Sequence, residues 1–174
     1  MVSFDVILHC LCGYWAPLNI TAVNSDGSDA SIWPGHYPSG MVQYTPDGYY
    51  SVIAAPNDTD STLRPKGLVQ GVPPIGDDAN WATVGKYSMA KAGTYSLSNI
   101  TAGHGHGGRD GLTFEMSAPT LTATNPQDVG SSNHLTFTFS DNCKSVVLVE
   151  GRGTVPWKLY YDKLPKVKIF ADEE

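Results

Sequence analysis

The stretch MVQYTPDGYYSVIAA, residues 41–55, is the segment that decides the fold. Aromatic and β-branched residues flank a central Thr-Pro-Asp-Gly. In that turn proline sets φ at the second position, and glycine tolerates a positive φ. This pattern predicts two antiparallel strands joined by a tight turn. We therefore expect a sheet built from hairpins.

Apolar residues at every second position recur in three later runs, as expected for strands with one buried face. These runs contain Leu112, Phe114 and Met116, then Leu135, Phe137 and Phe139, then Val155, Trp157, Leu159 and Tyr161. Further strands are expected at 14–23, 93–98 and 145–149, and one helix at about 78–91. About eight strands predict an all-β, closed antiparallel barrel, which can enclose one small ligand. The irregular stretch 56–76 is expected to act as a lid.

Length and charge narrow the function classes. The 174 residues fit a single domain over residues 1–174. A formal net charge of -6 disfavours nucleic acid and anionic membrane surfaces as partners. No apolar run approaches the roughly 20 residues of a membrane-spanning helix, so no membrane insertion is expected. The sequence leaves open whether the protein forms a homodimer.

Cysteines and sequons bear on localisation. Cys10, Cys12 and Cys143 cannot all pair within the chain, and buried thiols are the expectation. Three Asn-x-Thr sequons predict glycosylation if they are used, at Asn19, Asn57 and Asn99. Strand alternation is expected to turn Leu18 and Ile20 inward and Asn19 outward. The protein is then either cytoplasmic or, if the sequons are used and a signal peptide was removed, a protein of the secretory pathway.

Three motifs in order resemble the lipocalin-like domain family of fungal and bacterial natural-product pathways. They are Gly13-Tyr14-Trp15, Tyr44-Thr45-Pro46-Asp47-Gly48-Tyr49 with Ser51, and Tyr87 through Ala92-Gly93-Thr94-Tyr95. The resemblance implies a lipocalin-like barrel with a ligand cavity and with Trp15 packed at its closed end. Members include ligand binders and enzymes that guide cyclisations or isomerisations, among them Diels-Alder reactions. The resemblance thus implies a cavity, but no single activity.

A pocket is expected on the inward faces of the strands. Tyr50 and Gln43 are placed side by side across the hairpin, where a buried phenol and amide need hydrogen-bond partners that a ligand carbonyl could supply. We therefore predict Tyr50 and Gln43 as the catalytic pair. The predicted substrate-binding walls are Trp81, Tyr95, Phe114, Phe137, Phe139 and Trp157. Plain packing of these rings in a solid core is the alternative.

No cofactor is expected. His104-Gly105-His106 followed by Asp110 suggests a metal clip, but histidines in a glycine-rich loop are the simpler interpretation, and no metal is predicted. The chain contains neither a nucleotide-binding glycine motif after a strand nor a Gly-x-Ser-x-Gly elbow.

Two functions follow from these expectations. The first is a cofactor-independent cyclase or isomerase acting on an apolar natural-product intermediate, since such chemistry needs little more than shape, aromatic walls and hydrogen bonds to one carbonyl. The second is a non-catalytic carrier of the same kind of molecule.

Overall fold

The strands of this chain form one antiparallel sheet in the computed structural model. The structure describes residues 2–24, 26–28, 35–57, 78–104, 109–152 and 155–166. Over these ranges the strands are β1 Gly13–Ala22, β2 Pro38–Tyr44, β3 Tyr49–Pro56, β4 Met89–Thr94, β5 Ser96–Thr101, β6 Thr113–Ala123, β7 Ser132–Ser140, β8 Ser145–Arg152 and β9 Val155–Lys163.

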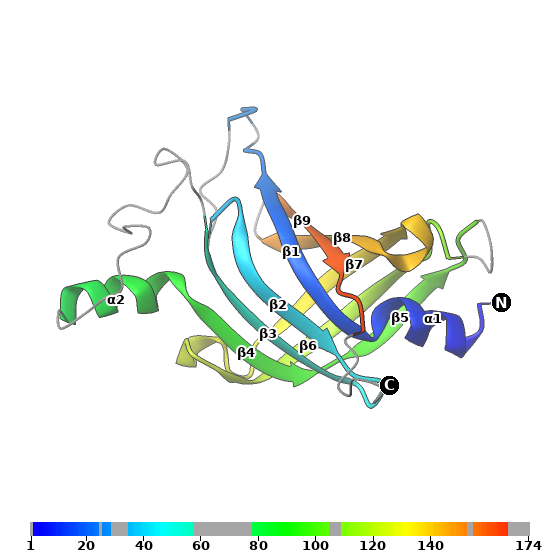
Figure 1. The fold of residues 1–174 in the computed structure, drawn as a ribbon, viewed down its shortest axis with the longest axis horizontal. Helices are drawn as coiled ribbons and strands as arrows, with labels where there is room; N and C mark the ends of the chain where they lie inside the picture. Colours follow the sequence, from blue (N-terminus) through cyan, green and yellow to red (C-terminus); the bar gives the residue numbers. More distant parts are fainter. Residues whose placement is uncertain are drawn as a thin grey trace, which may run out of the picture.

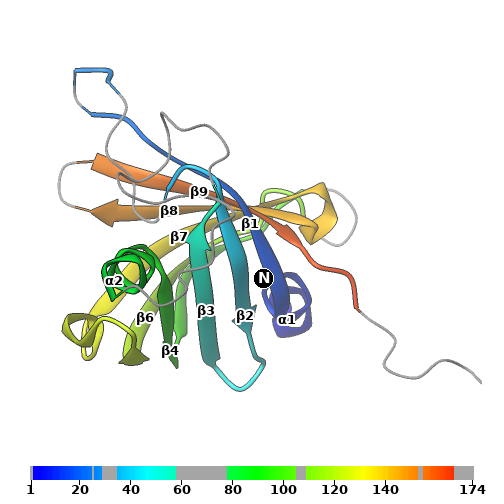
Figure 2. The same ribbon diagram turned by 60° about the vertical axis from the view of Figure 1, so that its left-hand side comes forward.

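The sheet closes on itself. Its order is β4-β3-β2-β1-β9-β8-β7-β6-β5, and β4 also pairs with β6, so the eight strands other than β5 form a closed ring. β5 continues the direction of β4 along β6 after a break at Tyr95. The predicted closed antiparallel barrel of about eight strands is therefore confirmed. The strands curve around one interior, with helix α1 (Phe4–Leu11) at one end and helix α2 (Asp78–Tyr87) at the other (Figures 1 and 2).

The hairpin at 41–55 forms as predicted. Gly48 has φ 85°, and its N–H donates to the Thr45 carbonyl, which closes the turn. Tyr44 pairs with Tyr50 across β2 and β3, and both side chains are buried. At barrel closure Tyr50 lies against Gly93, where a Cβ would collide with the Pro119 carbonyl. Glycine at position 93 thus permits the close approach of β4 and β6.

β1 contains a β-bulge that corrects one expectation. Its pairing with β9 shifts between Pro17 and Asn19, so the strict alternation is interrupted there. Ile20 is buried as expected, whereas Leu18 is 48% exposed, and its predicted inward position is wrong. The physical reason is the extra residue, which lets the strand change phase.

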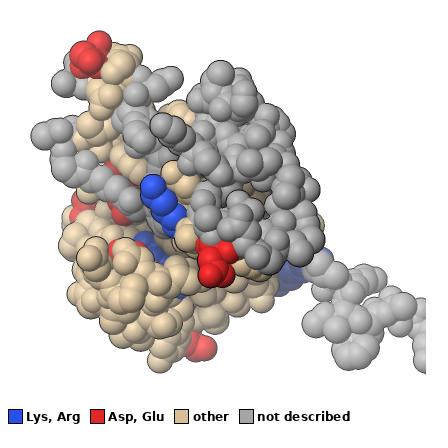
Figure 3. All heavy atoms as spheres, turned by 90° about the vertical axis from the view of Figure 1, so that its left-hand side faces the viewer, with Lys and Arg blue, Asp and Glu red and all other residues tan. Residues whose placement is uncertain are grey.

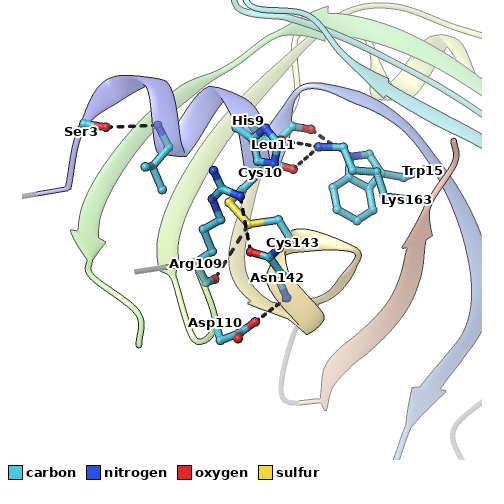
Figure 4. Close-up of a disulfide and its surroundings, with 11 residues drawn as sticks. Ser3, His9, Cys10, Leu11, Trp15, Arg109, Asp110, Asn142, Cys143 and Lys163 are labelled. Carbon is cyan, nitrogen blue, oxygen red and sulfur yellow. Dashed lines mark hydrogen bonds between the residues drawn. A yellow bond between two sulfur atoms is a disulfide. The ribbon is translucent and has the colours of Figure 1, made fainter. Parts of the chain in front are cut away.

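Helix α1, which the sequence did not predict, closes one end of the barrel (Figure 4). Its inner face buries Ile7, Cys10 and Leu11 in the main core. Trp15 is 1% exposed, as the resemblance implied, and its indole N–H donates to the Leu11 carbonyl at 2.9 Å. The Lys163 amine donates to the carbonyls of His9 and Cys10 in the last helical turn. A cation there complements the helix dipole.

A disulfide between Cys10 and Cys143 ties α1 to the 3-10 turn Asp141–Cys143. The expectation of buried thiols is therefore wrong for these two residues, because the fold brings together cysteines 133 positions apart, which sequence spacing cannot reveal. Cys12 stays a free thiol. Disulfides are typical of oxidising compartments, which favours the secretory one of the two predicted localisations.

The turn beneath the disulfide has an uncommon backbone. Asp141, Asn142 and Cys143 have φ values of 49°, 57° and 68°, the left-handed region that L-residues other than asparagine and aspartate seldom enter. The Asn142 N–H donates to the Asp110 carboxylate at 2.5 Å. This bond and the disulfide together hold the turn.

The predicted helix near 78–91 is confirmed as α2, but it ends at Tyr87 and residues 89–94 form β4 instead. Most of the predicted lid, 56–76, lies outside the described residues. Among the helices that the structure describes, none has the length and apolar character needed to cross a membrane.

Loss of the disulfide should destabilise the barrel by about 2–5 kcal/mol, because a cross-link over a long loop restricts the unfolded chain. We expect the double variant Cys10→Ser/Cys143→Ser to lower the urea midpoint, and reductant to lower that of the wild type equally. Cys12→Ser is the matched control and should leave the midpoint unchanged. A wild-type midpoint unaffected by reductant would contradict this role of the disulfide.

Candidate functional site

The half of the interior next to α1 is a packed aromatic core. Phe114, Phe137 and Phe139 are 1% exposed or less, and their ring centroids lie 5.1, 5.4 and 6.2 Å apart. Trp15 packs on Phe139 at 5.8 Å. The void in this region measures about 10 Å³, room for one water molecule at most. These three phenylalanines face inward as predicted, but here they pack against one another.

Tyr44 places a phenol in the middle of this core. Its ring contacts Tyr95 and Phe137 edge-on, with both centroids at 5.8 Å, and it lines the small void. No hydrogen bond joins the Tyr44 hydroxyl to another residue of the described ranges. Burial raises the pKa of Tyr44 well above the ordinary value for tyrosine, and the nearby Tyr161, Tyr50, Tyr95 and Glu150 raise it further. The hydroxyl therefore stays protonated.

Tyr50 and Gln43, the predicted pair, both line an open depression of about 310 Å³, but their side chains point to opposite faces of the sheet. Gln43 pairs with Ser51 rather than Tyr50, and its side-chain amide donates to the Tyr14 hydroxyl on the outer surface at 3.2 Å. Tyr50 faces inward, where its hydroxyl is hydrogen-bonded to Thr120 at 2.9 Å. The inward placement of Gln43 is wrong because neighbouring residues of a strand point to opposite faces, and Tyr44 takes the inward position.

Two predicted wall residues, Trp81 and Tyr95, line no space inside the described part of the barrel, although the Tyr95 ring packs on Tyr44. Trp81 is 58% exposed on α2, because this helix projects from the end of the barrel and does not cover its core. Tyr95 is half-buried at the break between β4 and β5, and its hydroxyl donates to the Thr45 carbonyl at 2.5 Å. Its role in this position is to brace the hairpin turn.

The half of the interior away from α1 contains an apolar hollow of about 30 Å³, room for about two water molecules. Trp157 is part of its wall, so it faces inward as predicted. The other apolar walls include Ile20, Val52, Ala54, Met89, Leu159 and Tyr161.

A much larger cavity, the mouth cavity, opens at the end of the barrel opposite α1. It measures about 730 Å³ and lies between the end of α2, the start of β4, the 3-10 turn Pro126–Asp128 and the start of β7. Its walls are mostly polar and include Lys86, Ser88, Met89, Lys91, Asp128 and Asn133. Met89 belongs to both spaces, so the mouth cavity adjoins the apolar hollow. Protein cavities that bind small molecules typically measure about 300–1,000 Å³.

Three inward polar residues were missed by the sequence analysis. Lys91 pairs with buried Val52, and directly paired residues of antiparallel strands share a face, so Lys91 points inward. By the same argument Asn133, paired with buried Ala118, points inward. Glu150 is 6% exposed and pairs with Trp157. The sequence did contain a signal for Glu150: Val146, Leu148 and Glu150 stand at every second position of one strand, so all three are expected to face inward.

The structure describes the histidine clip only in part, and the three sequon asparagines differ in their surroundings. His104 is exposed at an isolated bridge with Asp110, and His106 lies outside the described residues. Within the described ranges no cluster of three or more histidine, cysteine or acidic residues could hold a metal. Asn57 is exposed and Asn19 half-buried, while the Asn99 amide donates to Glu115 at 2.6 Å.

Stability should fall above about pH 10, where tyrosines of the unfolded chain ionise. Burial raises the pKa values of Tyr44, Tyr50 and Tyr95 in the folded state, so the unfolded state loses protons first as the pH rises. The stabilisation is complete below that pH and is lost as the pH climbs toward the folded-state pKa values. Urea midpoints between about pH 8 and pH 11 measure it.

In that series the urea midpoint of Tyr44→Phe should fall less between about pH 8 and pH 11 than the midpoint of the wild type. Tyr49→Phe changes a tyrosine that is 54% exposed on the outer surface, and its midpoint should fall as much as that of the wild type. A wild-type midpoint that stays level above about pH 10 would contradict the buried state of these phenols.

Comparison with known proteins assigns no family or function to this chain. No family model, no curated protein and no solved structure matches the chain. The lipocalin-like resemblance therefore stays a prediction from three sequence motifs, and the function has to be argued from the mouth cavity itself.

Proposed function

We propose that this protein binds a small amphipathic molecule at the end of the barrel opposite α1. The observation that carries the proposal is the mouth cavity of about 730 Å³, which shares Met89 with the apolar hollow. The polar part of the ligand lies among Lys91, Asn133 and Ser88, and the apolar part points toward Met89 and Trp157. A ligand with both parts matches the two adjoining environments.

The narrow hollow makes Met89 the gate between the two spaces. With room for only about two water molecules, the hollow cannot take a ligand chain unless a wall residue moves. Methionine is unbranched and flexible, so rotation of Met89 is the least costly way to widen the passage. The closed half offers no such route, because its rings are in mutual contact.

Between the two functions expected from the sequence, this geometry supports the carrier. Catalysis by Tyr50 and Gln43 requires both groups to reach one substrate carbonyl. Instead the Tyr50 hydroxyl is bonded to Thr120, and Gln43 is bonded to Tyr14 on the outside. Binding needs only the cavity and its polar and apolar walls.

Blocking the mouth cavity should weaken ligand binding. The uncharged fluorescent amphiphile N-phenyl-1-naphthylamine should bind the wild type, and Asn133→Trp, which fills the cavity from β7, should weaken it about tenfold or more. His134→Trp is the matched control, since the neighbouring side chain points to the outer face and should leave binding intact. Equal binding by both variants, with unchanged melting temperatures, would show that the probe binds elsewhere.

A cyclase or isomerase remains a proposal with its own test. The protein is incubated with small-molecule extract from a strain of the source organism that lacks this gene, and mass spectrometry detects compounds that change only when protein is present. The carrier function predicts that compounds co-purify with the protein without conversion. A new product formed in catalytic amounts would favour the enzyme and would make Glu150→Gln the first variant to assay.

A further inference from the structure

We propose that two copies of this chain form a dimer through the outer wall of the barrel, where β1, β2, β3, β4 and β6 are neighbours. The inference goes beyond the proposed function and concerns a different surface. The observation behind it is a group of large apolar side chains that stand exposed on these strands. This group, the outer patch, consists of Tyr14, Met41, Tyr49, Ile53 and Leu121, which are between 39% and 62% exposed.

The strand register places the outer patch on one face. Tyr49 and Ile53 both point outward from β3, because residues separated by an even number of positions share a face of a strand. Ile53 pairs directly with Met41 on β2, and directly paired residues of antiparallel strands lie side by side on one face. Tyr14 on β1 pairs with Gln43, two positions from Met41 on that face. The patch therefore crosses the wall in which β1, β2, β3 and β4 are adjacent (Figures 1 and 2).

A hollow lies next to the projecting side chains of the patch. This open depression of about 310 Å³ is lined by Tyr49 and Leu121 together with small or uncharged residues such as Ser51 and Ala92. Ile53 lies two residues, about 7 Å, from Ser51 on the same face of β3. A twofold axis between the depression and Ile53 would let the Ile53 side chain of each copy enter the depression of the other. The wall is thus complementary to itself, as a symmetric dimer requires.

The charge of the chain selects a second copy as the partner. Because the formal net charge is -6, two copies repel each other wherever their charged surfaces meet. β2, β3 and β4 lie wholly within the described residues; β2 and β3 contain no charged residue, and Lys91, the charged residue of β4, points inward. At the α2 end, by contrast, Figure 3 shows exposed basic and acidic atoms. Two copies can therefore meet at this wall without opposing like charges, whereas a charged partner would find no opposite charge there.

The exposed area approaches what a stable dimer needs. Large side chains have roughly 150–250 Å² each, so five that are about half exposed present on the order of 500 Å². The largest apolar patch of a typical monomer measures about 300–600 Å² and is often functional. The uncharged residues between the five side chains extend this face toward the roughly 800 Å² that each partner buries in a standard interface. None of the five lines the mouth cavity, so dimerisation and ligand binding have separate tests.

Sedimentation equilibrium between about 1 and 100 μM tests the dimer. The wild type should approach twice the 18.7 kDa of one chain at the higher concentrations. Ile53→Lys places a charge in the patch with no opposite charge to meet, so it should weaken dimerisation about 100-fold or more. Ile100→Lys makes the same substitution at an exposed isoleucine of β5, outside the patch, and as the matched control it should behave as wild type.

Salt gives a second reading of the same interface. Since the contacts are uncharged and the whole chains repel each other, dimerisation of the wild type should strengthen between about 0.05 and 0.5 M salt. An interface held by ion pairs would weaken over that range.

Met41 locates the interface without a variant. With carbon-13 labelled methionine methyl groups, dilution of the wild type should shift the Met41 signal, because Met41 belongs to the patch. The signal of Met116, which is buried in the core, should stay in place. If Ile53→Lys does not fold, this dilution series decides the question.

Three results would overturn the proposal. The first is a wild type that stays monomeric at about 100 μM, which would leave the patch to a different apolar partner or to none. The second is a dimer that Ile53→Lys and Ile100→Lys weaken equally. The third is a Met41 signal that does not change on dilution while the dimer dissociates.

Discussion

The pairing of Tyr44 with Tyr50 across the turn at 45–48 is the constraint on which the rest of the barrel depends. Because side chains alternate along a strand, one pair that faces inward fixes the orientation of every residue in β2 and β3. Val52 then faces inward, and its partner on β4 is Lys91. The same register sends Gln43 to the outer surface, so this one pairing decides which polar residues can reach a ligand.

The interior is divided into a half that stabilises the fold and a half that can bind. Next to α1, packed rings, the Trp15 indole bonded to the Leu11 carbonyl and the Cys10–Cys143 disulfide leave no space for a ligand. At the other end polar residues replace the rings, and the mouth cavity opens. Dense packing stabilises the fold, whereas a binding cavity does not. Because the two lie at opposite ends of the barrel, the protein can have both.

Much of the fold could be predicted from the sequence, since alternation and the Pro-Asp-Gly turn are local signals. The hairpin, the inward phenylalanines and α2 follow from them. The phase of alternation could not be predicted: Gln43 and Tyr50 were assigned to one face, and the bulge in β1 turned Leu18 outward. Lys91 was assigned to the end of a helix, so its inward position was missed. Pairings between distant residues, such as the disulfide, have no local signal at all.

The most direct test of ligand binding at the barrel mouth uses the methionine methyl groups as reporters. The chain has four methionines; three lie in distinct environments: Met89 at the mouth cavity, Met116 in the packed core and Met41 on the outer surface. With carbon-13 labelled methyl groups, titration of N-phenyl-1-naphthylamine should shift the Met89 signal and leave those of Met116 and Met41 in place. Shifts at Met116 or Met41, with Met89 unchanged, would contradict binding at the mouth.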